Sequence, residues 1–567
     1  MRRLGDWLDG RLGHRALVAR LLDEPVPGGA RFAYAAGSVL VVLLGLQAAT
    51  GAALAFVYTP STAGAWASLV YLEHAVPAGA LVRGLHHFGA WAIVIVLGLH
   101  LVQTALFGAH RAPRELTWWS GLGLGALVFA FALTGYLLPW DQRGYWATRV
   151  ATDIAGGQPL VGPWLRRLLQ GGSGLGNLTL TRFYALHVLV LPAVALALLA
   201  FHLVSFRRHG ITPGWRVREG DPVGRFWPDQ LWRDAVLALA AVLAVFFAAR
   251  GGAGLGPPAD PAGHFEPRPE WYFLPLFELL RLAHGPRAVW LASLAPALAA
   301  LLLAALPFLD RGVSRAPLAR WRPLGALGLL LAATAGLGLA SAAQDRADPR
   351  VAAADRRADD DARRAIALAR DGVPPEGPLA MLAADPVERG RRAFERRCAG
   401  CHAPESGLAK GPRLDGFLSP AWIDGLLKNP DAAAYYGHTK AAKGMDGYAS
   451  MAPAELARLT AFLASLAAHD GPPAVLPAAL QPGAAAFAAA GCDSCHSLSP
   501  GEAMPGPNLA GYGSDRWLNE LLDRPGGPLA YGDVNGMPSF AGKLAPDERA
   551  GLLAYLHSLR SDDGPVR

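Results

Sequence analysis

Residues 84–100 read GLHHFGAWAIVIVLGLH, an apolar stretch with histidines near both ends. His86 and His100 are spaced i, i+14, so a helix with roughly 100° and 1.5 Å per residue carries both on about one face, about 21 Å apart. The adjacent His87 is spaced i, i+13 from His100, which turns it towards the other side of the helix. The stretch therefore predicts a membrane-length helix that presents two histidines, at two depths, to one neighbour.

A second stretch repeats this pattern. Residues 187–202 read HVLVLPAVALALLAFH, with His187 and His202 spaced i, i+15. Two such helices side by side place histidine opposite histidine at two levels, which is the geometry for two stacked hemes b, each held by two imidazoles. A lone histidine in a membrane span usually only forms a polar contact with another helix. Four histidines at matched spacings make that interpretation weak.

Four glycines share the same period. Gly37 and Gly51 are spaced i, i+14, and so are Gly121 and Gly135. A glycine permits the close approach of a bulky ring to the backbone, so we expect these four to face the hemes. Taken alone, glycines in an Ala- and Gly-rich membrane protein indicate helix packing, and only the shared period favours the heme role.

The chain is too hydrophobic for an ordinary soluble protein. Its 567 residues are 52% apolar, and seven runs with few or no charges reach or approach the ~20 residues that span a bilayer. These runs are Phe32–Tyr58, Gly84–Ala109, Leu116–Trp140, Phe183–Phe206, Ala235–Ala249, Ala288–Leu309 and Pro323–Gln344. The sequence thus predicts an all-α, polytopic membrane bundle of seven transmembrane helices, four of which bind heme, followed by two small helical domains.

Arginines orient this bundle. With the N-terminus in the cytoplasm, the inner loops hold 18 arginines and the outer loops hold 10, so the positive-inside rule favours that orientation. Seven spans then leave everything after Gln344 on the outer side of a bacterial cytoplasmic membrane. The membrane-flanking arginines account for much of the net charge of +7, and no nucleic-acid partner is expected.

All four cysteines fall in two CxxCH motifs. These are Cys398-Ala-Gly-Cys401-His402 and Cys492-Asp-Ser-Cys495-His496. In CxxCH two thiols bind the vinyl groups of a heme while the histidine ligates its iron, so each motif predicts one covalent heme c. Structural zinc, the alternative, prefers a second cysteine pair. No cysteine is left for a disulfide or for an iron–sulfur cluster.

Each motif opens a similar unit, and the two units form an internal duplication at roughly 90 residues. The sixth ligand in each unit should be a methionine, which raises the heme potential. Met537, in Gly536-Met-Pro538, is the candidate in the second unit, and alignment of the units selects Met445 in the first. Met451 stays open as the alternative to Met445, whereas Met504 is expected to pack against the heme or lie in a loop.

Four segments resemble cytochrome b of quinol:cytochrome c oxidoreductases. They are Arg114-Glu-Leu-Thr-Trp118, Thr134-Gly-Tyr-Leu-Leu-Pro-Trp-Asp-Gln142, Thr181-Arg-Phe-Tyr-Ala-Leu-His187 and Pro269-Glu-Trp-Tyr272. The i, i+15 interval and the seven runs resemble the chloroplast type, with cytochrome b and subunit IV joined end to end. The C-terminal units resemble class I cytochromes c. Phe32–Ala35 contains no cysteine, so the extra covalent heme of the chloroplast type is not expected.

The resemblance and the composition together divide the chain into five parts. We expect a four-helix heme-binding cytochrome b domain in 1–215, a three-helix subunit IV-like domain in 216–345, a charged linker in 346–385, and cytochrome c domains in 386–470 and 475–563.

The resemblance also implies roles for individual residues. His86 and His187 would bind the outer heme b, and His100 and His202 the inner one. Glu270 would accept a proton from quinol in an outer pocket shaped by Pro269, Trp271, Tyr272 and the turn 139–141; its alternative is an interfacial carboxylate. Arg83 and Arg114 would pair with heme propionates, although either could be a snorkelling interface residue.

These roles imply the core subunit of a bacterial quinol–cytochrome c reductase with two hemes b and two hemes c. Quinol would send one electron to a Rieske protein and the other through the hemes b, with coupled proton translocation. Because no cysteine remains, the Rieske protein must be a separate partner; the quinone pool, membrane lipid, a soluble cytochrome c or similar acceptor and a second copy of the chain complete the expected partners.

Two alternatives belong to other classes. A diheme b anchor that relays electrons between the quinone pool and another redox enzyme gives no reason for Pro269–Tyr272. A redox sensor with open heme coordination is disfavoured by Met445 and Met537.

Overall fold

The computed structural model describes residues 2–218, 220–263, 265–266, 268–283, 285–402, 410–414, 416–439, 444–466 and 476–560. The described chain divides into two compact units, one formed by Met1–Ala354 with Asp361–Pro378 and the other by Asp355–Asp360 with Leu379–Arg567. We call them the membrane unit and the C-terminal unit.

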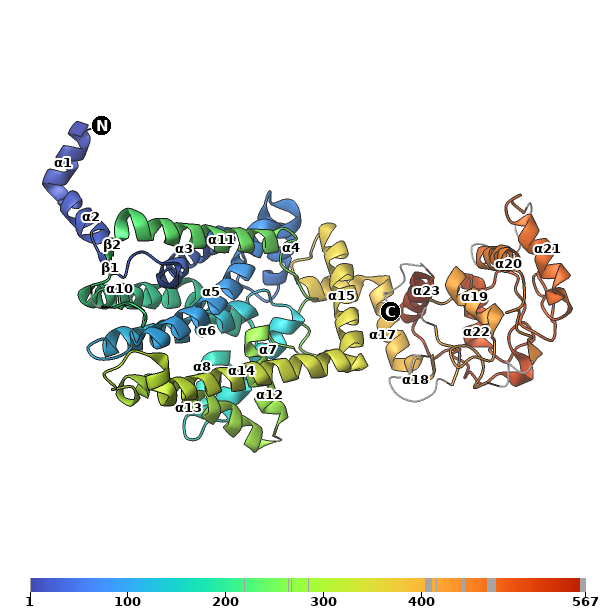
Figure 1. The fold of residues 1–567 in the computed structure, drawn as a ribbon. Helices are drawn as coiled ribbons and strands as arrows, with labels where there is room; N and C mark the ends of the chain where they lie inside the picture. The colour runs from blue at the N-terminus through green and yellow to red at the C-terminus, as the bar shows by residue number, and fades with distance from the viewer. Residues whose placement is uncertain are drawn as a thin grey trace. The chain divides into compact units, whose positions relative to one another are not determined.

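Helices dominate the membrane unit (Figure 1). They are α1 (Arg2–Leu12), α2 (His14–Leu22), α3 (Ala36–Ala55), α4 (Ala65–Ala75), α5 (Gly79–Phe107), α6 (Glu115–Leu137), α7 (Gln142–Gly156), α8 (Gly162–Gln170), α9 (Asn177–Ala185), α10 (Leu191–His209), α11 (Leu231–Ala249), α12 (Leu274–Arg281), α13 (Pro286–Leu309) and α14 (Trp321–Ala347). Two short strands, β1 (Pro25–Pro27) and β2 (Val223–Arg225), pair antiparallel with Val26 opposite Gly224. This pairing ties the N-terminal segment to the segment before α11.

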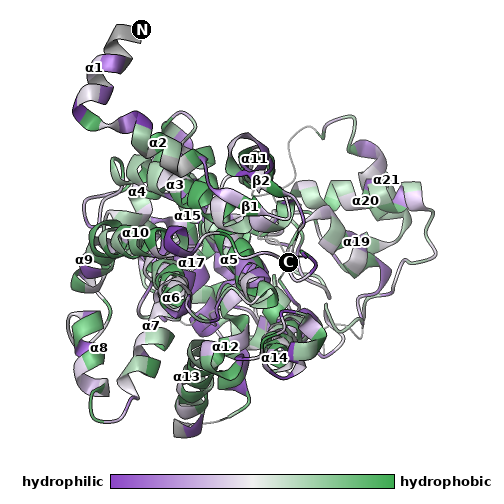
Figure 2. Ribbon diagram, turned by 60° about the vertical axis from the view of Figure 1, so that its left-hand side comes forward, coloured by the Kyte–Doolittle hydropathy of each residue, from purple (hydrophilic) through white to green (hydrophobic). Residues whose placement is uncertain are grey.

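Within the described residues, seven helical segments are long and apolar enough to cross a membrane, which confirms the predicted bundle. They are Ala36–Ala55, Gly79–Phe107, Glu115–Leu137, Asn177–His209, Phe226–Ala249, Arg287–Leu309 and Pro317–Ala347. The fifth run, short in the sequence, gains its length on its N-terminal side. Leu196, Leu298 and Leu329 are strongly exposed, as expected of side chains that face lipid. Figure 2 shows hydrophobic residues along α10 and α13, in contrast to α17.

The membrane helices pack as neighbouring pairs. Helix α3 lies against α5, α6 against α10, and α11 against both α3 and α5. Apolar side chains such as Leu43, Ile93 and Val245 fill the space between α3, α5 and α11. A second cluster, including Trp118, Leu306 and Leu327, joins α5 and α6 to α13 and α14. The histidine-bearing helices α5 and α10 each therefore have a fixed partner.

A single π turn, Leu186–Val190, interrupts the span between α9 and α10. Pro192, which has no N–H to donate, follows it at the start of α10. Such turns insert one extra residue into an α-helix and are common at functional sites. Here the turn contains His187.

Helix α15 (Pro349–Arg370) follows the last span and is strongly charged, as the predicted linker requires. Its first turn is capped by Asp348, whose side chain accepts a hydrogen bond from the Arg350 N–H. The segment called a charged linker from its sequence is thus a capped helix over much of its length.

The C-terminal unit contains both CxxCH repeats around one shared core. Its helices are α16 (Pro378–Ala384), α17 (Pro386–Arg397), α18 (Ala399–His402), α19 (Pro420–Lys428), α20 (Pro453–Ser465), α21 (Gln481–Ala489), α22 (Asp515–Asp523) and α23 (Pro546–Ser558). A single hydrophobic cluster draws residues from both repeats, such as Phe394, Leu459, Phe487 and Leu552.

Candidate heme and quinol sites

The histidine pair predicted for the outer heme b comes from two neighbouring spans. His86 lies in α5 and His187 in the π turn, and their ring centroids are 6.2 Å apart with an interplanar angle of 68°. Metal–imidazole bonds are about 2 Å long, so two rings on opposite sides of one ion have centroids roughly 6 Å apart. The pair therefore fits a heme iron held between the two rings.

Hydroxyl side chains orient three of the four membrane histidines. Thr50 Oγ1 lies 3.0 Å from His86 Nδ1, and Thr134 Oγ1 lies 3.1 Å from His187 Nδ1. Both threonines donate their own protons to helix carbonyls, at 2.7 and 2.8 Å. The hydroxyl oxygens must then accept a proton from Nδ1, which leaves Nε2 of each ring to ligate iron.

The inner level repeats this arrangement. Ser120 Oγ lies 2.9 Å from His202 Nδ1 and donates to the Thr117 carbonyl at 3.0 Å. His100 interacts electrostatically with His202, so the second pair is also brought together across the bundle. Thr50, Thr134 and Ser120 were missed by the sequence analysis, although a signal existed, because each immediately precedes one of the periodic glycines.

Each periodic glycine faces one imidazole ring. A Cβ added to Gly51 would lie 3.1 Å from Cε1 of His86, and one added to Gly135 would lie 2.7 Å from Cε1 of His187. At the inner level the corresponding distances are 3.4 Å from Gly37 to His100 and 3.1 Å from Gly121 to His202. The glycines therefore make room for the histidine rings themselves, on helices α3 and α6.

The two arginines predicted to meet propionates have protein partners. Arg83 is buried; it forms an ion pair with Glu73 and donates to the carbonyls of Ala253 and Gly254 at 2.7 and 3.0 Å. Arg114 donates to Thr212 Oγ1 at 2.9 Å and to the His209 carbonyl at 2.6 Å. Arg83 thus ties α5 to α4 and to the segment after α11, and Arg114 fixes the segment after α10. The role of both arginines towards propionates stays a prediction.

Glu270 stands where the loop before α12 meets α5. Its Oε2 accepts a hydrogen bond of 3.1 Å from Trp91 Nε1. Burial raises the pKa of Glu270 above that of an ordinary carboxyl, while the Trp91 hydrogen bond and nearby Arg143 oppose that shift. A carboxylate with a raised pKa can accept a proton from a substrate hydroxyl and release it again.

Aromatic side chains surround this carboxylate. Trp271 and Tyr272 follow it in a short 3₁₀ turn, η4 (Trp271–Phe273), and Trp271 lies 6.4 Å from Trp91 between ring centroids. Burial, followed by the charge of Glu270, raises the pKa of Tyr272, so its hydroxyl stays protonated. Pro269, which was also predicted to shape the pocket, directly precedes Glu270 in the loop before η4.

The turn at 139–141 holds the neighbouring outer loop. Asp141 caps α7 by accepting from the Gly144 N–H at 2.8 Å, and its other oxygen accepts from the Gly256 N–H at 3.0 Å. Trp140, at a φ of +49°, accepts through its carbonyl from the Ala259 N–H at 3.0 Å. The turn thus holds the segment 256–259 by hydrogen bonds to its backbone N–H groups.

The histidines of both CxxCH motifs are oriented by carbonyl groups. His402 Nδ1 lies 2.8 Å from the Pro412 carbonyl, and His496 Nδ1 lies 2.8 Å from that of Pro507. A carbonyl can only accept, so Nδ1 carries the proton and Nε2 is left as the ligand. Burial lowers the pKa of both histidines, which keeps the neutral ligand form.

A glycine precedes each of these prolines. A Cβ on Gly411 would lie 2.9 Å from Cε1 of His402, and one on Gly506 would lie 2.7 Å from Cε1 of His496. The close glycine–imidazole contact of the membrane unit therefore recurs at the covalent sites. The sequence analysis missed both residues, although the shared Gly-Pro dipeptide after each CxxCH was a visible signal.

Met445 and Met537 occupy equivalent positions in the two repeats. Three residues after each, the N–H of Tyr448 donates to the Leu427 carbonyl and that of Phe540 donates to the Leu522 carbonyl, both at 2.7 Å. Both methionines are half-buried against the shared core, and so is Met451. The equivalence supports Met445 over Met451 as the ligand.

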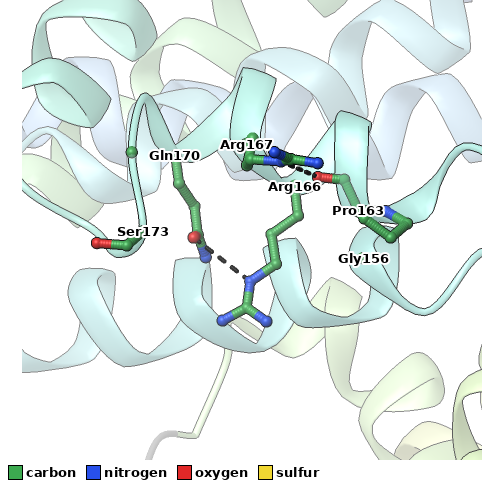
Figure 3. A pocket seen from close by; sticks show the side chains of 7 residues that line it. Gly156, Pro163, Arg166, Arg167, Gln170 and Ser173 are labelled. Carbon is green, nitrogen blue, oxygen red and sulfur yellow. Dashed lines mark hydrogen bonds between the residues drawn. The ribbon is translucent and has the colours of Figure 1, made fainter.

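A hollow in the membrane unit lies outside these sites. It is lined by Gly156 and by residues of α8 and the turn after it, and Figure 3 shows Arg166 and Arg167 at its centre. Their guanidinium groups donate to Gln170 Oε1 at 3.4 Å and to the Pro163 carbonyl at 3.2 Å. None of the predicted site residues lines this hollow.

Four family models match successive parts of the chain. Residues 21–210 match the family model Cytochrome b/b6/petB, and residues 262–356 match Cytochrome b(C-terminal)/b6/petD. Residues 387–467 match Cytochrome c, and residues 478–556 match Cytochrome C oxidase, cbb3-type, subunit III.

Relatives and a solved structure agree with these matches. Cytochrome b6 of Tupiella akineta is 39% identical over 212 residues, which are 37% of this chain and 99% of that protein. Cytochrome b6 of Porphyra purpurea is 38% identical over the same length and shares of the two chains. A solved chain described as hyperthermophilic respiratory Complex III has 28% identity and a TM-score of 0.51, over 60% of this chain and 95% of that chain.

Proposed function

The chain belongs to the cytochrome b/b6 family and continues into cytochrome c repeats, and from this premise we propose that it is the core subunit of a bacterial quinol:cytochrome c oxidoreductase. It is a bc-type electron-transfer subunit of a quinol oxidoreductase complex that carries heme b and heme c. To this we add the reaction, the number of hemes, the partners and the orientation.

When bound, hemes b supply one-electron carriers at the two histidine levels and hemes c supply them at the two CxxCH motifs. Five of the six imidazoles, those of His86, His187, His202, His402 and His496, are held in one tautomer by Thr50, Thr134, Ser120, Pro412 and Pro507 respectively. The two levels in α5 and α10 extend a path across the bilayer. This path supports transfer of one quinol electron towards the cytoplasmic side.

Glu270 is the residue that we assign to proton acceptance. Oxidation of a quinol releases two electrons and two protons, so the site needs a base close to a low-dielectric pocket. The Trp91 hydrogen bond holds the Glu270 carboxylate against α5, where the Trp91 ring also meets Trp271 of η4. Its raised pKa suits a group that takes a proton from quinol and passes it to the outer aqueous phase.

The partners follow from electron balance. One quinol electron passes to a separate Rieske protein, since all four cysteines belong to CxxCH motifs, and the other crosses the membrane to quinone. The fused cytochrome c repeats receive the Rieske electron and pass it to a soluble cytochrome c or similar acceptor. The arginine distribution supports a cytoplasmic N-terminus and an outer location of the repeats, and two copies of the chain form the complex.

The observation that carries the proposal is the half-buried Glu270 held by Trp91, and substitution of Glu270 tests it. We expect Glu270→Gln to lower quinol:cytochrome c activity about 100-fold or more, because the amide cannot accept the proton. Glu266→Gln is the matched control, since Glu266 is 70% exposed and makes only a 3.8 Å ion pair with Arg268. Wild-type activity in Glu270→Gln with full heme content would reject the proposal in favour of a relay without quinol oxidation.

A further inference from the structure

The helices that flank the two CxxCH motifs are paired across the repeats. Helix α17, which runs directly into the first motif, packs on α23, the last helix of the second repeat. Helix α21, which runs into the second motif, packs on α20, the last helix of the first repeat. Each repeat thus supplies the helix before one heme site and the helix that completes the other.

Close contacts fix the pairing of α17 with α23. A Cβ on Gly390 would overlap the Gly551 carbonyl oxygen and would lie 2.8 Å from Tyr555 Cβ, so the two backbones meet at a glycine crossing. Phe394 lies against Tyr555, with ring centroids 5.4 Å apart. The same crossing recurs between α21 and α20, where a Cβ on Gly483 would lie 2.6 Å from Phe462 Cβ.

One ion pair links the helix before the first CxxCH motif to the helix that follows the other repeat's methionine. Arg396, two residues before Cys398, forms an ion pair of 2.8 Å with Glu548. Glu548 lies in the first turn of α23, the helix that follows the Met537 loop. The Cys398 end of α17 is therefore tied through its side chains to α23, both to the first turn, which follows the Met537 loop, and to Tyr555.

The second pair shows this exchange at the methionine loop itself. Tyr448, three residues after Met445, donates its hydroxyl to the Ala490 carbonyl at 3.3 Å. Ala490 caps α21 two residues before Cys492, and Tyr448 also forms a side-chain hydrogen bond with Cys492. The Met445 loop of the first repeat is thus closed over the second CxxCH motif.

We propose that the two heme c sites are exchanged between the repeats: His402 shares its heme iron with Met537, and His496 shares its heme iron with Met445. The expectation from sequence, in which each repeat supplies both ligands of its own heme, is replaced by this crossed pairing. The proposal depends on attachment of heme c at both motifs, but not on quinol oxidation or on any partner.

Tagging one heme makes the pairing measurable in the complete complex. Cys398→Ala leaves the first heme attached through Cys401 alone, and its retained vinyl group, conjugated with the porphyrin, moves the absorption band of that heme to longer wavelength. The midpoint potential of the tagged heme can then be followed separately in a redox titration. Because a thioether ligand raises the potential of a heme, its loss lowers that potential.

In the Cys398→Ala background we expect Met537→Leu to lower the potential of the tagged heme and to abolish its methionine–iron absorption band. Met445→Leu and the control Met504→Leu should leave both unchanged. A reciprocal Cys492→Ala background should reverse the result, with Met445→Leu acting on the tagged heme, so either background suffices if the other loses heme. A response of the Cys398→Ala heme to Met445→Leu, or to neither substitution, would overturn the exchange.

Discussion

At the residue scale, each membrane histidine with a hydroxyl partner is part of a small repeated unit. The hydroxyl residue fixes the tautomer of the imidazole, and the glycine that follows it gives the ring its space, as Thr134 and Gly135 do for His187. The glycine is required for steric reasons, because a methyl group at its position would meet the ring. The hydroxyl is required for hydrogen bonding, because without it Nδ1 would be unsatisfied and the tautomer undefined. The hydroxyl–glycine dipeptide is therefore as necessary to the site as the histidine ligand itself.

Gly135→Ala should weaken the binding of the outer heme b. The added Cβ would lie 2.7 Å from Cε1 of His187, and overpacking of this kind costs about 1–3 kcal/mol, enough to weaken heme retention by about 5- to 150-fold. Optical quantification of heme b in the purified complex checks this. Gly45→Ala is the control, because nothing lies within 4 Å of its Cβ position; equal heme b in both variants would contradict the assignment.

Trp91→Phe should move the acid limb of the pH–activity profile to higher pH. Glu270 acts as a base only when deprotonated, so activity falls as the pH falls through its pKa, which burial already raises. The Trp91 hydrogen bond stabilises the carboxylate and lowers that pKa, and its removal must raise it further. Quinol oxidation rates measured across pH check the shift. Trp119→Phe, whose indole N–H donates to the Ala304 carbonyl at 2.9 Å, should leave the profile unchanged.

At the scale of elements, the π turn explains an inequality in the histidine spacing. His86 and His100 are spaced i, i+14 in an uninterrupted helix, whereas His187 and His202 are spaced i, i+15. The turn at Leu186–Val190 takes up one residue, so both intervals bring their histidines to matching depths and faces. The sequence showed the extra residue without showing where the helix absorbs it.

Removal of that extra residue should therefore be tolerated. Deletion of Leu189 together with Pro192→Ala gives the second pair the i, i+14 spacing of the first in a segment free to form a plain α-helix, and both hemes b should be retained. The matched deletion of Val94 shortens the His86–His100 spacing to i, i+13, which rotates one histidine by about 100°, and heme b should be lost. Low-spin heme b spectra distinguish the outcomes; equal loss in both deletions would show that the turn has another role.

At the scale of the whole molecule, the chain joins two units in which histidines are arranged alike. In both units most of the predicted ligand histidines have an Nδ1 held by a hydrogen bond, and a glycine lies against the ring. We expect two neighbouring spans of the membrane unit to supply the histidines that would hold each heme b, and a CxxCH histidine with a methionine to hold each heme c in the C-terminal unit. The shared core of the repeats means that neither repeat is a complete folding unit, because α17 needs α23 and α21 needs α20.

The complete molecule should contain hemes b and c in a 1:1 ratio. Pyridine hemochrome analysis of the purified chain measures both types, and we expect two of each. His100→Ala should remove one heme b and leave heme c unchanged, which shifts the ratio to 1:2. A single heme b in the unmodified protein, or two after this substitution, would contradict the two-level arrangement.

The sequence by itself determined the seven spans, the four membrane histidines and the two CxxCH motifs. Those features are local, because helix periodicity and fixed ligand spacing are written in neighbouring residues. Only the tertiary structure decided that Arg83 pairs with Glu73, that hydroxyls on α3 and α6 orient histidines on α5 and α10, and that α17 packs on α23. Because the two repeats are alike, the sequence of α17 does not show whether this helix packs on α20 or on α23. Contacts between residues far apart in the sequence, such as Gly390 with Gly551, decide for α23.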